Sequence, residues 1–384
     1  MKKALPLFLI CILICCGAHA QRTEVYNPHI HTVQVIANND YMAPAAIRLG
    51  EGETVEISFD HLTHDYHRYQ YVLTHCNADW TPSDLSETEY LDGFNDNPIE
   101  DHDISVNTTL PYTHYRLTLP NDQVRPKLSG NYRLVVYDDA EGKNKPAFST
   151  CFRILEKEVN ISAQVSSDTE IDRNKTHQQV SFSIQHKGYP IRNPQNEIKV
   201  HVLQDNRTDN EVTNLQPSYV GPDQLRYEHN RALIFPAGNE YRRFEMVSTR
   251  YASQGVESIR YHAPYYHVTL QPDLPRLLNY SYDQDQNGRF VIRYDEAFTY
   301  DDFNEENLLK YNPETHAYEC ARLLKQGAYN YQYLYVAPGS TVGSTAQAEG
   351  NFYETENEYL ILVYHRPFGE RYDRLIGMQQ VSYK

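Results

Sequence analysis

Three histidines recur at every third position, at His61, His64 and His67. Imidazole groups at short spacings are ligands that zinc uses in many protein sites. The surrounding residues, however, have the pattern of a strand end followed by a loop, where side chains three positions apart need not converge. The local pattern favours ordinary strand and loop histidines, and we expect no metal here.

A second pattern matches the first half of a calcium-binding loop, with ligand-type residues at Asp283, Asp285, Asn287 and Gly288. A complete loop of this kind needs a glutamate at its twelfth position, which binds the ion through both carboxylate oxygens. Tyr294 stands at that position. Because Asn-Gly is also a strong hairpin signal, the sequence favours a polar hairpin turn, and we expect no cofactor.

The remaining candidate for chemistry is a thiol beside an imidazole, at His75 and Cys76, with Asp79 close by. Such a pair could supply a nucleophile and its base. Adjacent residues of a strand point to opposite faces, so these two side chains cannot form a dyad within a strand. The sequence also lacks the G-x-S-x-G, HExxH and P-loop motifs. We therefore predict a protein that is not an enzyme, with a buried cysteine next to a structural histidine.

The elements around these residues have the pattern of antiparallel strands. Apolar and polar residues alternate over residues 69–73, 112–119 and 132–137, and Pro, Gly, Asn and Asp clusters separate these runs. A period of two is typical of half-buried strands. With similar runs at residues 33–36, 54–59 and 147–155, the first section holds about seven strands. That number suits an immunoglobulin-like sandwich, although the Cys…Trp…Cys spacing of antibody domains is absent.

Further alternating runs follow a charged join at residues 156–158, and residues 271–275 have the pattern of a second join. We predict an all-β chain of two or three consecutive β-sandwich, immunoglobulin-like domains with few short helices. The predicted sections are residues 21–155, which carry the sequence HCNADW, then residues 156–275, and a C-terminal sandwich at residues 276–384. Helix is expected only in a short turn at residues 83–87 and over residues 302–311. Residues 328–336 should place four tyrosines on one face of a strand.

The first twenty residues have the pattern of a cleaved export signal. Lys2 and Lys3 precede an apolar run, which ends in the small-residue site Ala18-His19-Ala20. The run is too short to cross a bilayer as a helix. We predict that residues 1–20 are a signal peptide, that the protein is exported, and that the mature chain has no direct membrane span.

The mature chain is acidic, which limits its partners. Without the two signal lysines, the formal net charge of −16 becomes −18. Nucleic acid and anionic lipid headgroups attract concentrated positive charge, so neither is an expected partner. Three cysteines remain, Cys76, Cys151 and Cys320, which leaves open either one disulfide with a free thiol or three buried thiols.

Several segments form a recognisable set, and they are spread over essentially the whole mature chain. They include HCNADW at residues 75–80, SGNY at 129–132, FPAGNEYR at 235–242, ETENEY at 354–359 and RPFGERYD at 366–373. In these segments the chain resembles the plug protein family of the type IX secretion system. The signature residues, expected to be structural or partner-binding, are His75, Cys76, Asp79, Trp80, Ser83, Tyr90, Gly93, Phe94, Arg366, Pro367, Gly369, Arg371 and Asp373.

The resemblance implies a periplasmic protein of Bacteroidota that associates peripherally with the outer membrane. Its implied partner is the giant outer-membrane β-barrel translocon of this system, and the plug closes the periplasmic mouth of that barrel while no cargo is transported. The implied mechanism is steric and needs no catalytic residue, metal or cofactor. Outside the complex a monomer is expected. The loops at residues 95–103 and 339–350 are hypothetical barrel contacts.

The alternative interpretation is an exported carbohydrate-binding β-sandwich protein. The last section of the chain, in which Gly327 precedes an alternating tyrosine strand, is similar to starch- and glycogen-binding sandwiches. In those domains, exposed aromatic rings stack on sugars. Against this interpretation, the chain has a single tryptophan, Trp80, and it lies in the first section. A third interpretation, a hydrolase with paired carboxylates, has no motif to support it.

Overall fold

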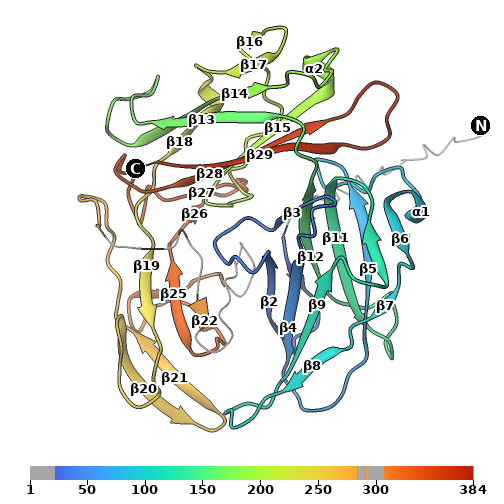
Figure 1. The fold of residues 1–384 in the computed structure, drawn as a ribbon. Coiled ribbons are helices and arrows are strands. Elements are labelled where there is room, and N and C mark those ends of the chain that lie inside the picture. Colours follow the sequence, from blue (N-terminus) through green and yellow to red (C-terminus); the bar gives the residue numbers. More distant parts are fainter. Residues whose placement is uncertain (1–21, 283–284, 286, 288–290, 293–306, 384) are drawn as a thin grey trace, which may run out of the picture.

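A computed structural model describes residues 22–282, 285, 287, 291–292 and 307–383. Among these residues the structure is almost entirely β, which confirms the predicted all-β class. The helices in the described part are short: α1 (Glu87–Tyr90), α2 (Pro194–Glu197) and the 3-10 turn η1 (Arg231–Leu233). Figure 1 shows three parts: a first sandwich in blue and cyan, a second in green and red, and an inserted section in yellow and orange.

The first sandwich has two main antiparallel sheets and a small ribbon. One sheet has the order β1-β12-β11-β5-β7, with β3 parallel to β12; the other has the order β2-β4-β9-β8; the ribbon is β10-β6. Their bounds are β1 (Glu24–Val25), β2 (Ile30–Ala37), β3 (Ala46–Arg48), β4 (Val55–His61), β5 (Tyr69–Cys76), β6 (Leu91–Gly93), β7 (Asn97–Pro98), β8 (Asp101–Ile104), β9 (Thr113–Leu119), β10 (Val124–Pro126), β11 (Gly130–Asp138) and β12 (Pro146–Leu155).

An aromatic cluster joins these two sheets at the centre of the first sandwich. The Phe59 ring of β4 stacks on Tyr115 of β9 with centroids 5.1 Å apart. Across the sandwich, it meets Tyr69 of β5 and Phe148 of β12 edge to face, at 5.0 and 4.8 Å. All four rings are fully buried. The alternating runs therefore direct one face of each strand into a core of large rings, where edge-to-face pairs add to the hydrophobic stabilisation.

The second sandwich combines strands from two distant parts of the chain. One sheet has the order β13-β14-β17-β16, with β18 also paired to β14; the other is β15-β28-β29. Their bounds are β13 (Asn160–Ser166), β14 (His177–Gln185), β15 (Ile198–Gln204), β16 (Tyr219–Val220), β17 (Gln224–Tyr227), β18 (Ile234–Pro236), β28 (Glu358–His365) and β29 (Arg374–Ser382). The pairing of β15 with β28 runs from Ile198↔His365 to Gln204↔Tyr359. This arrangement differs from a C-terminal section, residues 276–384, that forms a sandwich of its own.

Residues 241–355 lie between β18 and β28, and we call them the inserted section. They carry a small sheet of order β19-β25-β22 and three two-stranded ribbons, β20-β21, β23-β24 and β26-β27. Their bounds are β19 (Arg242–Glu245), β20 (Val256–His262), β21 (Tyr265–Leu270), β22 (Val291–Ile292), β23 (Lys310–Asn312), β24 (Ala317–Glu319), β25 (Gly327–Tyr331), β26 (Tyr335–Val336) and β27 (Gly343–Ser344).

The two helix predictions have different outcomes. A helical turn does follow the HCNADW segment, but α1 begins at Glu87 and not at residue 83, with Ser86 as its N-cap. The helix predicted over residues 302–311 is wrong at its C-terminal end, because Lys310 and Tyr311 begin strand β23; residues 302–306 lie outside the described residues. Pairing with β24 gives these residues strand hydrogen bonds that a short, uncapped helix could not match.

Candidate functional site

The signature segments meet where the two sandwiches touch, around the fully buried carboxylate of Asp373. This carboxylate accepts hydrogen bonds from the Ala78 main-chain N–H at 2.9 Å, from Lys199 Nζ at 2.9 Å and from Arg366 Nε at 2.8 Å. Burial alone would raise the pKa of Asp373, but the Ala78, Lys199 and Arg366 donors lower it below its ordinary value. The charged carboxylate therefore ties the first sandwich, through Ala78, to the second. We call this contact the joint.

A chain of amide hydrogen bonds surrounds the joint. Arg366 Nη2 donates to Asn77 Oδ1 at 2.6 Å. Asn131 Nδ2 donates to the Asn77 carbonyl at 2.8 Å, and Tyr364 of β28 donates its hydroxyl proton to Asn131 Oδ1 at 2.9 Å. Because these groups are mostly buried, each hydrogen bond holds a group that would be costly to leave unpaired. The joint is thus a satisfied polar network that fixes one sandwich on the other.

His75 and Cys76 take structural positions beside the joint. The imidazole lies between the Ser83 hydroxyl, 2.9 Å from Nδ1, and the Ser129 carbonyl, 3.0 Å from Nε2. Its Nε2–H donates to that carbonyl, and burial lowers the pKa of the ring. Burial also raises the pKa of the buried Cys76 thiol to about 11, so this thiol stays protonated. The pair therefore lacks a thiolate, and both nitrogens of its imidazole are engaged by Ser83 and Ser129 and not by the thiol.

Asp79 and Trp80 shape the turn that leads from β5 into the joint. Asp79 Oδ1 accepts hydrogen bonds from the N–H and the hydroxyl of Thr81, at 3.1 and 2.6 Å. Trp80 has a φ of 63°, in the left-handed region, which costs a bulky residue on the order of 1–3 kcal/mol. Its ring is buried, and the Arg153 guanidinium lies 5.1 Å from the ring centroid. Packing therefore holds the tryptophan in a strained turn.

The remaining signature residues lie on either side of α1 or at the surface. Arg371 donates to the Asp84 carbonyl at 2.9 Å and pairs with Glu89; hydrogen bonds from Ser86 and then Arg371 lower the pKa of Glu89 to about 2. The buried Tyr90 donates its hydroxyl proton to the Leu73 carbonyl. Gly93 packs against Val124, whereas Phe94 is 84% exposed; Pro367 is half-buried and Gly369 is exposed.

Gly130 provides a test of how tightly the joint is packed. Its φ is +133°, and an added Cβ would lie 2.7 Å from His75 Nε2 and 3.1 Å from the Asp373 carbonyl. Gly130→Ala should therefore lower the free energy of unfolding by about 2–4 kcal/mol through strain and overpacking. The control is Gly142→Ala, whose φ of +80° is also positive but whose new Cβ meets nothing within 4 Å. Thermal unfolding of both variants measures the difference, and equal shifts would show that the joint tolerates expansion.

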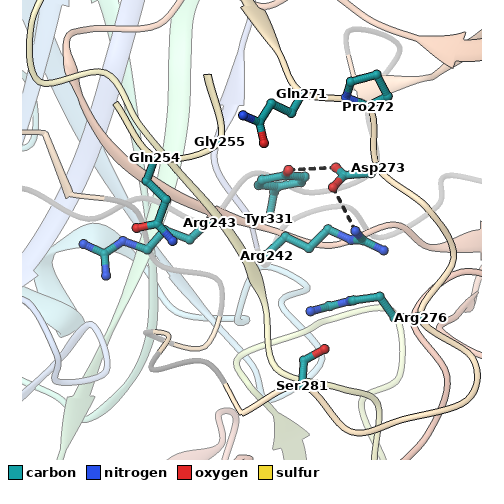
Figure 2. A pocket seen from close by; sticks show the side chains of 10 residues that line it. All are labelled: Arg242, Arg243, Gln254, Gly255, Gln271, Pro272, Asp273, Arg276, Ser281 and Tyr331. Carbon is teal, nitrogen blue, oxygen red and sulfur yellow. Dashed lines mark hydrogen bonds and ion pairs between the residues drawn. The ribbon is translucent and has the colours of Figure 1, made fainter. Parts of the chain in front are cut away.

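A second ion network lies within the inserted section and ties its segments together. The fully buried Glu349 pairs with Arg242 at 3.1 Å and with Arg276 at 2.8 Å. Asp273 pairs with Arg242 at 2.8 Å and accepts the Tyr331 hydroxyl at 2.7 Å. Figure 2 shows these two side chains directed at Asp273 in a polar cavity of about 400 Å³. Since Arg242, Arg276 and Arg243 are each already paired with a carboxylate, the cavity is not built to attract an anion.

A third contact connects the inserted section with the first sandwich. Lys325 Nζ lies 2.7 Å from the fully buried carboxylate of Asp60, which also pairs with His114 at 2.8 Å. The same ammonium lies 4.5 Å from the centroid of the Tyr112 ring. The inserted section is also tied to the second sandwich, because Arg207 donates to the Gly343 carbonyl at 2.9 Å and the Gly343 N–H donates to Asp209 at 2.8 Å. With the joint, these contacts fasten each of the three parts to its neighbours.

The residues considered for metal binding do not assemble into a site. The ring centroids of His61 and His67 are 4.1 Å apart, but the His64 ring contacts the Ser105 hydroxyl and not the other two histidines. Over the part of the chain that the structure describes, no three His, Cys, Asp or Glu side chains are placed to hold a metal. In the possible calcium loop, Asp285 accepts the N–H groups of Tyr241 and Asn287, while residues 283, 288 and 294 lie outside the described residues.

The resemblance included Asp373 and Arg366 together with the segments that hold Ala78, Asn77 and Asn131, but it missed Lys199 and Tyr364. These two come from strands far away in the sequence, and the Asp60–Lys325 pair spans more than two hundred residues. Spacing carries no signal for such pairs. An acidic residue between strand segments gives no indication of the cation that it will meet after folding.

Comparisons with known proteins agree with this fold. Residues 30–156, which form the first sandwich, match the family described as "Type 9 secretion system plug protein 1st domain". The chain is also similar to the crystal structure of a hypothetical protein from Parabacteroides merdae, with 46% sequence identity and a TM-score of 0.91 over 94% of this chain and 100% of that one. No curated protein matches the chain. The chain belongs to the type IX secretion system plug family.

Proposed function

We propose that the protein is a non-catalytic plug of the type IX secretion translocon. It binds the periplasmic mouth of a giant outer-membrane β-barrel and seals it while no cargo is transported. The proposal starts from the family of the first sandwich, which gives the chain a role in type IX secretion. From the buried contacts that make the molecule rigid, we infer that this chain seals the barrel.

The observation that supports a sealing role is the set of buried polar contacts among the three parts. Domains that meet only through small polar surfaces usually move relative to one another. Here the fully buried Asp60 of the first sandwich pairs with Lys325 of the inserted section, and the fully buried Asp373 of the second sandwich accepts the Ala78 N–H of the first. Breaking such a pair leaves an uncompensated charge, which is strongly unfavourable. A broad body stiffened in this way can obstruct a pore without any covalent chemistry.

The remaining properties are consistent with a peripheral periplasmic protein. No helix in the described residues is long and apolar enough to cross a bilayer. The net charge of −16 keeps an exported body well hydrated between binding events. In this proposal the chain is exported by its signal peptide, associates with the outer membrane through the translocon, and is a monomer outside the complex.

The carbohydrate-binding alternative is not favoured by the tyrosine segment. Tyr329 is buried and stacks on Phe244. Tyr331 and Tyr333 stand edge to face, and both donate hydroxyl protons to Asp273. A sugar-stacking platform needs exposed rings that share a plane, and these three rings serve packing and hydrogen bonding instead.

The test is a pull-down of the tagged full chain from detergent-solubilised envelopes of its native host, followed by mass spectrometry. Recovery of a very large outer-membrane β-barrel is the expected result, and a deletion strain should then admit a large periplasm-excluded dye through the open barrel. An untagged strain processed in parallel gives the background. Recovery of the protein alone, free in the periplasmic fraction, would overturn the proposal.

A further inference from the structure

The ribbon β20-β21 is an amphipathic hairpin at the end of the inserted section that lies furthest from the second sandwich (Figure 1, gold). Its register pairs Ile259 with Val268 and Tyr261 with Tyr266, so these four side chains share one face. Tyr261 is 57% exposed and Tyr266 39% exposed, with ring centroids 4.9 Å apart. On this face, the two exposed tyrosines lie next to the turn. The half-buried Ile259 and Val268 lie behind them, further from the turn.

The part of the hairpin next to its turn lacks the acidic excess of the rest of the chain. The opposite face carries Arg260, His262, Tyr265 and His267, all exposed. Residues 258–269 contain no Asp or Glu, and the one acidic residue of the two strands, Glu257, lies at the end away from the turn. Surfaces that associate arrange complementary charge around an apolar centre. A partner for this hairpin should therefore present an apolar or aromatic surface bordered by carboxylates.

The open edges of the hairpin argue for a protein partner over a lipid one. Among the described residues, β20 and β21 form a sheet only with each other. Within that described part, neither outer edge has a strand partner for its main-chain N–H and C=O groups. Such edges are expensive in the hydrocarbon of a bilayer, but they can pair with a strand of another protein. A two-stranded hairpin is also only marginally stable in water, so a partner that adds strands or packs on its face would stabilise it.

We propose that this hairpin is the surface by which the chain docks on its translocon. Its Ile259, Tyr261, Tyr266 and Val268 face packs against an apolar, carboxylate-bordered surface of the barrel protein, and its edges are available to an extended segment of that protein outside the closed barrel. The inference rests on the proposed function and deepens it by naming the contact. Each tyrosine supplies a large rigid ring with a polar end, the kind of side chain that carries much of the binding energy in protein interfaces.

The test uses the full chain in its native host. Tyr261→Ser combined with Tyr266→Ser removes both rings of this face without touching a buried residue, and it leaves Tyr265 on the opposite face unchanged. The matched control combines Tyr311→Ser with Tyr318→Ser on the β23-β24 ribbon. There the rings are also exposed and 5.2 Å apart, but acidic Glu314 and Glu319 lie beside them. We expect the hairpin variant to lose about 10-fold or more of barrel recovery, and the control to keep it. The two variants should have the same melting temperature as the wild type.

A photo-crosslinking residue identifies what the hairpin touches. Tyr261→p-benzoylphenylalanine should form an adduct with the barrel protein, whereas the same residue at position 318 should not. Adducts only with a second copy of the chain or with lipid would overturn the inference. So would full barrel capture by the hairpin variant, which would leave the proposed function intact. If the wild-type chain captures no barrel, the proposed function itself fails, and this inference with it.

Discussion

Replacing Asp373 with alanine should lower the free energy of unfolding by about 2–4 kcal/mol, because a fully buried acceptor of three hydrogen bonds is lost. The substitution leaves the Ala78 N–H without its acceptor, and Lys199 and Arg366, whose side chains are 39% and 32% exposed, lose their shared counter-charge. The loss should appear as a large decrease in the apparent melting temperature. Hydrogen exchange should also rise in residues 75–80 and in β15, because these segments meet at the joint.

The control for this prediction is an exposed ion pair of the same loop. Arg371 and Glu89 also connect the two sandwiches, but their side chains are 51% and 39% exposed. Exposed pairs contribute about 0–1 kcal/mol, so Arg371→Ala should have little effect on unfolding. An Asp373→Ala variant as stable as Arg371→Ala would show that the joint is not held by the buried charge. The Asp373→Asn variant, which keeps an acceptor for Ala78, should lie between the two.

The sequence was informative about local structure in the first sandwich. The alternating runs at residues 54–59, 69–73, 112–119 and 132–137 lie within β4, β5, β9 and β11 or directly adjoin them. This worked because one face of each strand is buried, which forces the period of two. Helix α1 could be anticipated near the HCNADW segment because a Ser and Glu three positions apart mark a helix start.

Long-range pairing could not be predicted in the same way. Strands β28 and β29 have a strong apolar pattern, but nothing in it tells that β28 will pair with β15 across the whole inserted section. Residues 328–336 have the tyrosine alternation of one strand, yet the chain leaves the sheet after Tyr331 because Tyr331 and Tyr333 both turn to Asp273. In each case a distant side chain or strand decided the outcome.

The candidate site, too, could be predicted only in part from the sequence. The resemblance selected Asp373, Arg366, Asn77 and Gly130 as parts of one pattern, and the structure brings them together at the joint. It also selected Phe94 and Gly369, which lie at the surface, and whether they bind a partner stays a prediction. A motif does not separate residues that hold the fold from residues that face a partner, because both kinds stand side by side in the same loops.

The contribution of Asp205 to stability should fall as the pH rises from 5 to 8, whereas the buried His61, His75 and His365, whose pKa values are lowered by burial, act in the opposite direction below about pH 6.5. Burial raises the pKa of this carboxyl to about 8, and nearby Asp285 adds to the effect, although the Glu358 N–H at 2.8 Å opposes it. Between the unfolded value near 4 and pH 8, the folded state therefore keeps a proton that the unfolded state has lost. Since folding then binds a proton, this contribution to the free energy of unfolding decreases with rising pH, by on the order of 3 kcal/mol from pH 5 to pH 8. Glu240, whose pKa burial raises to about 7, contributes in the same direction.

Asp205→Asn separates this effect from general pH sensitivity. The amide stays neutral, it can still accept the Glu358 N–H through its oxygen, and asparagine tolerates the φ of 49° at this position. Melting temperatures between pH 5 and pH 8.5 should decline less steeply for the variant than for the wild type, so that the variant is the more stable protein at pH 8. Asp139→Asn, at a half-exposed side chain, should follow the wild-type profile. Parallel profiles for all three proteins would mean that Asp205 is already ionised in the folded state. In that case, the carboxylate would need a compensating positive charge, and Arg207, whose charge lowers the pKa of Asp205, could supply it.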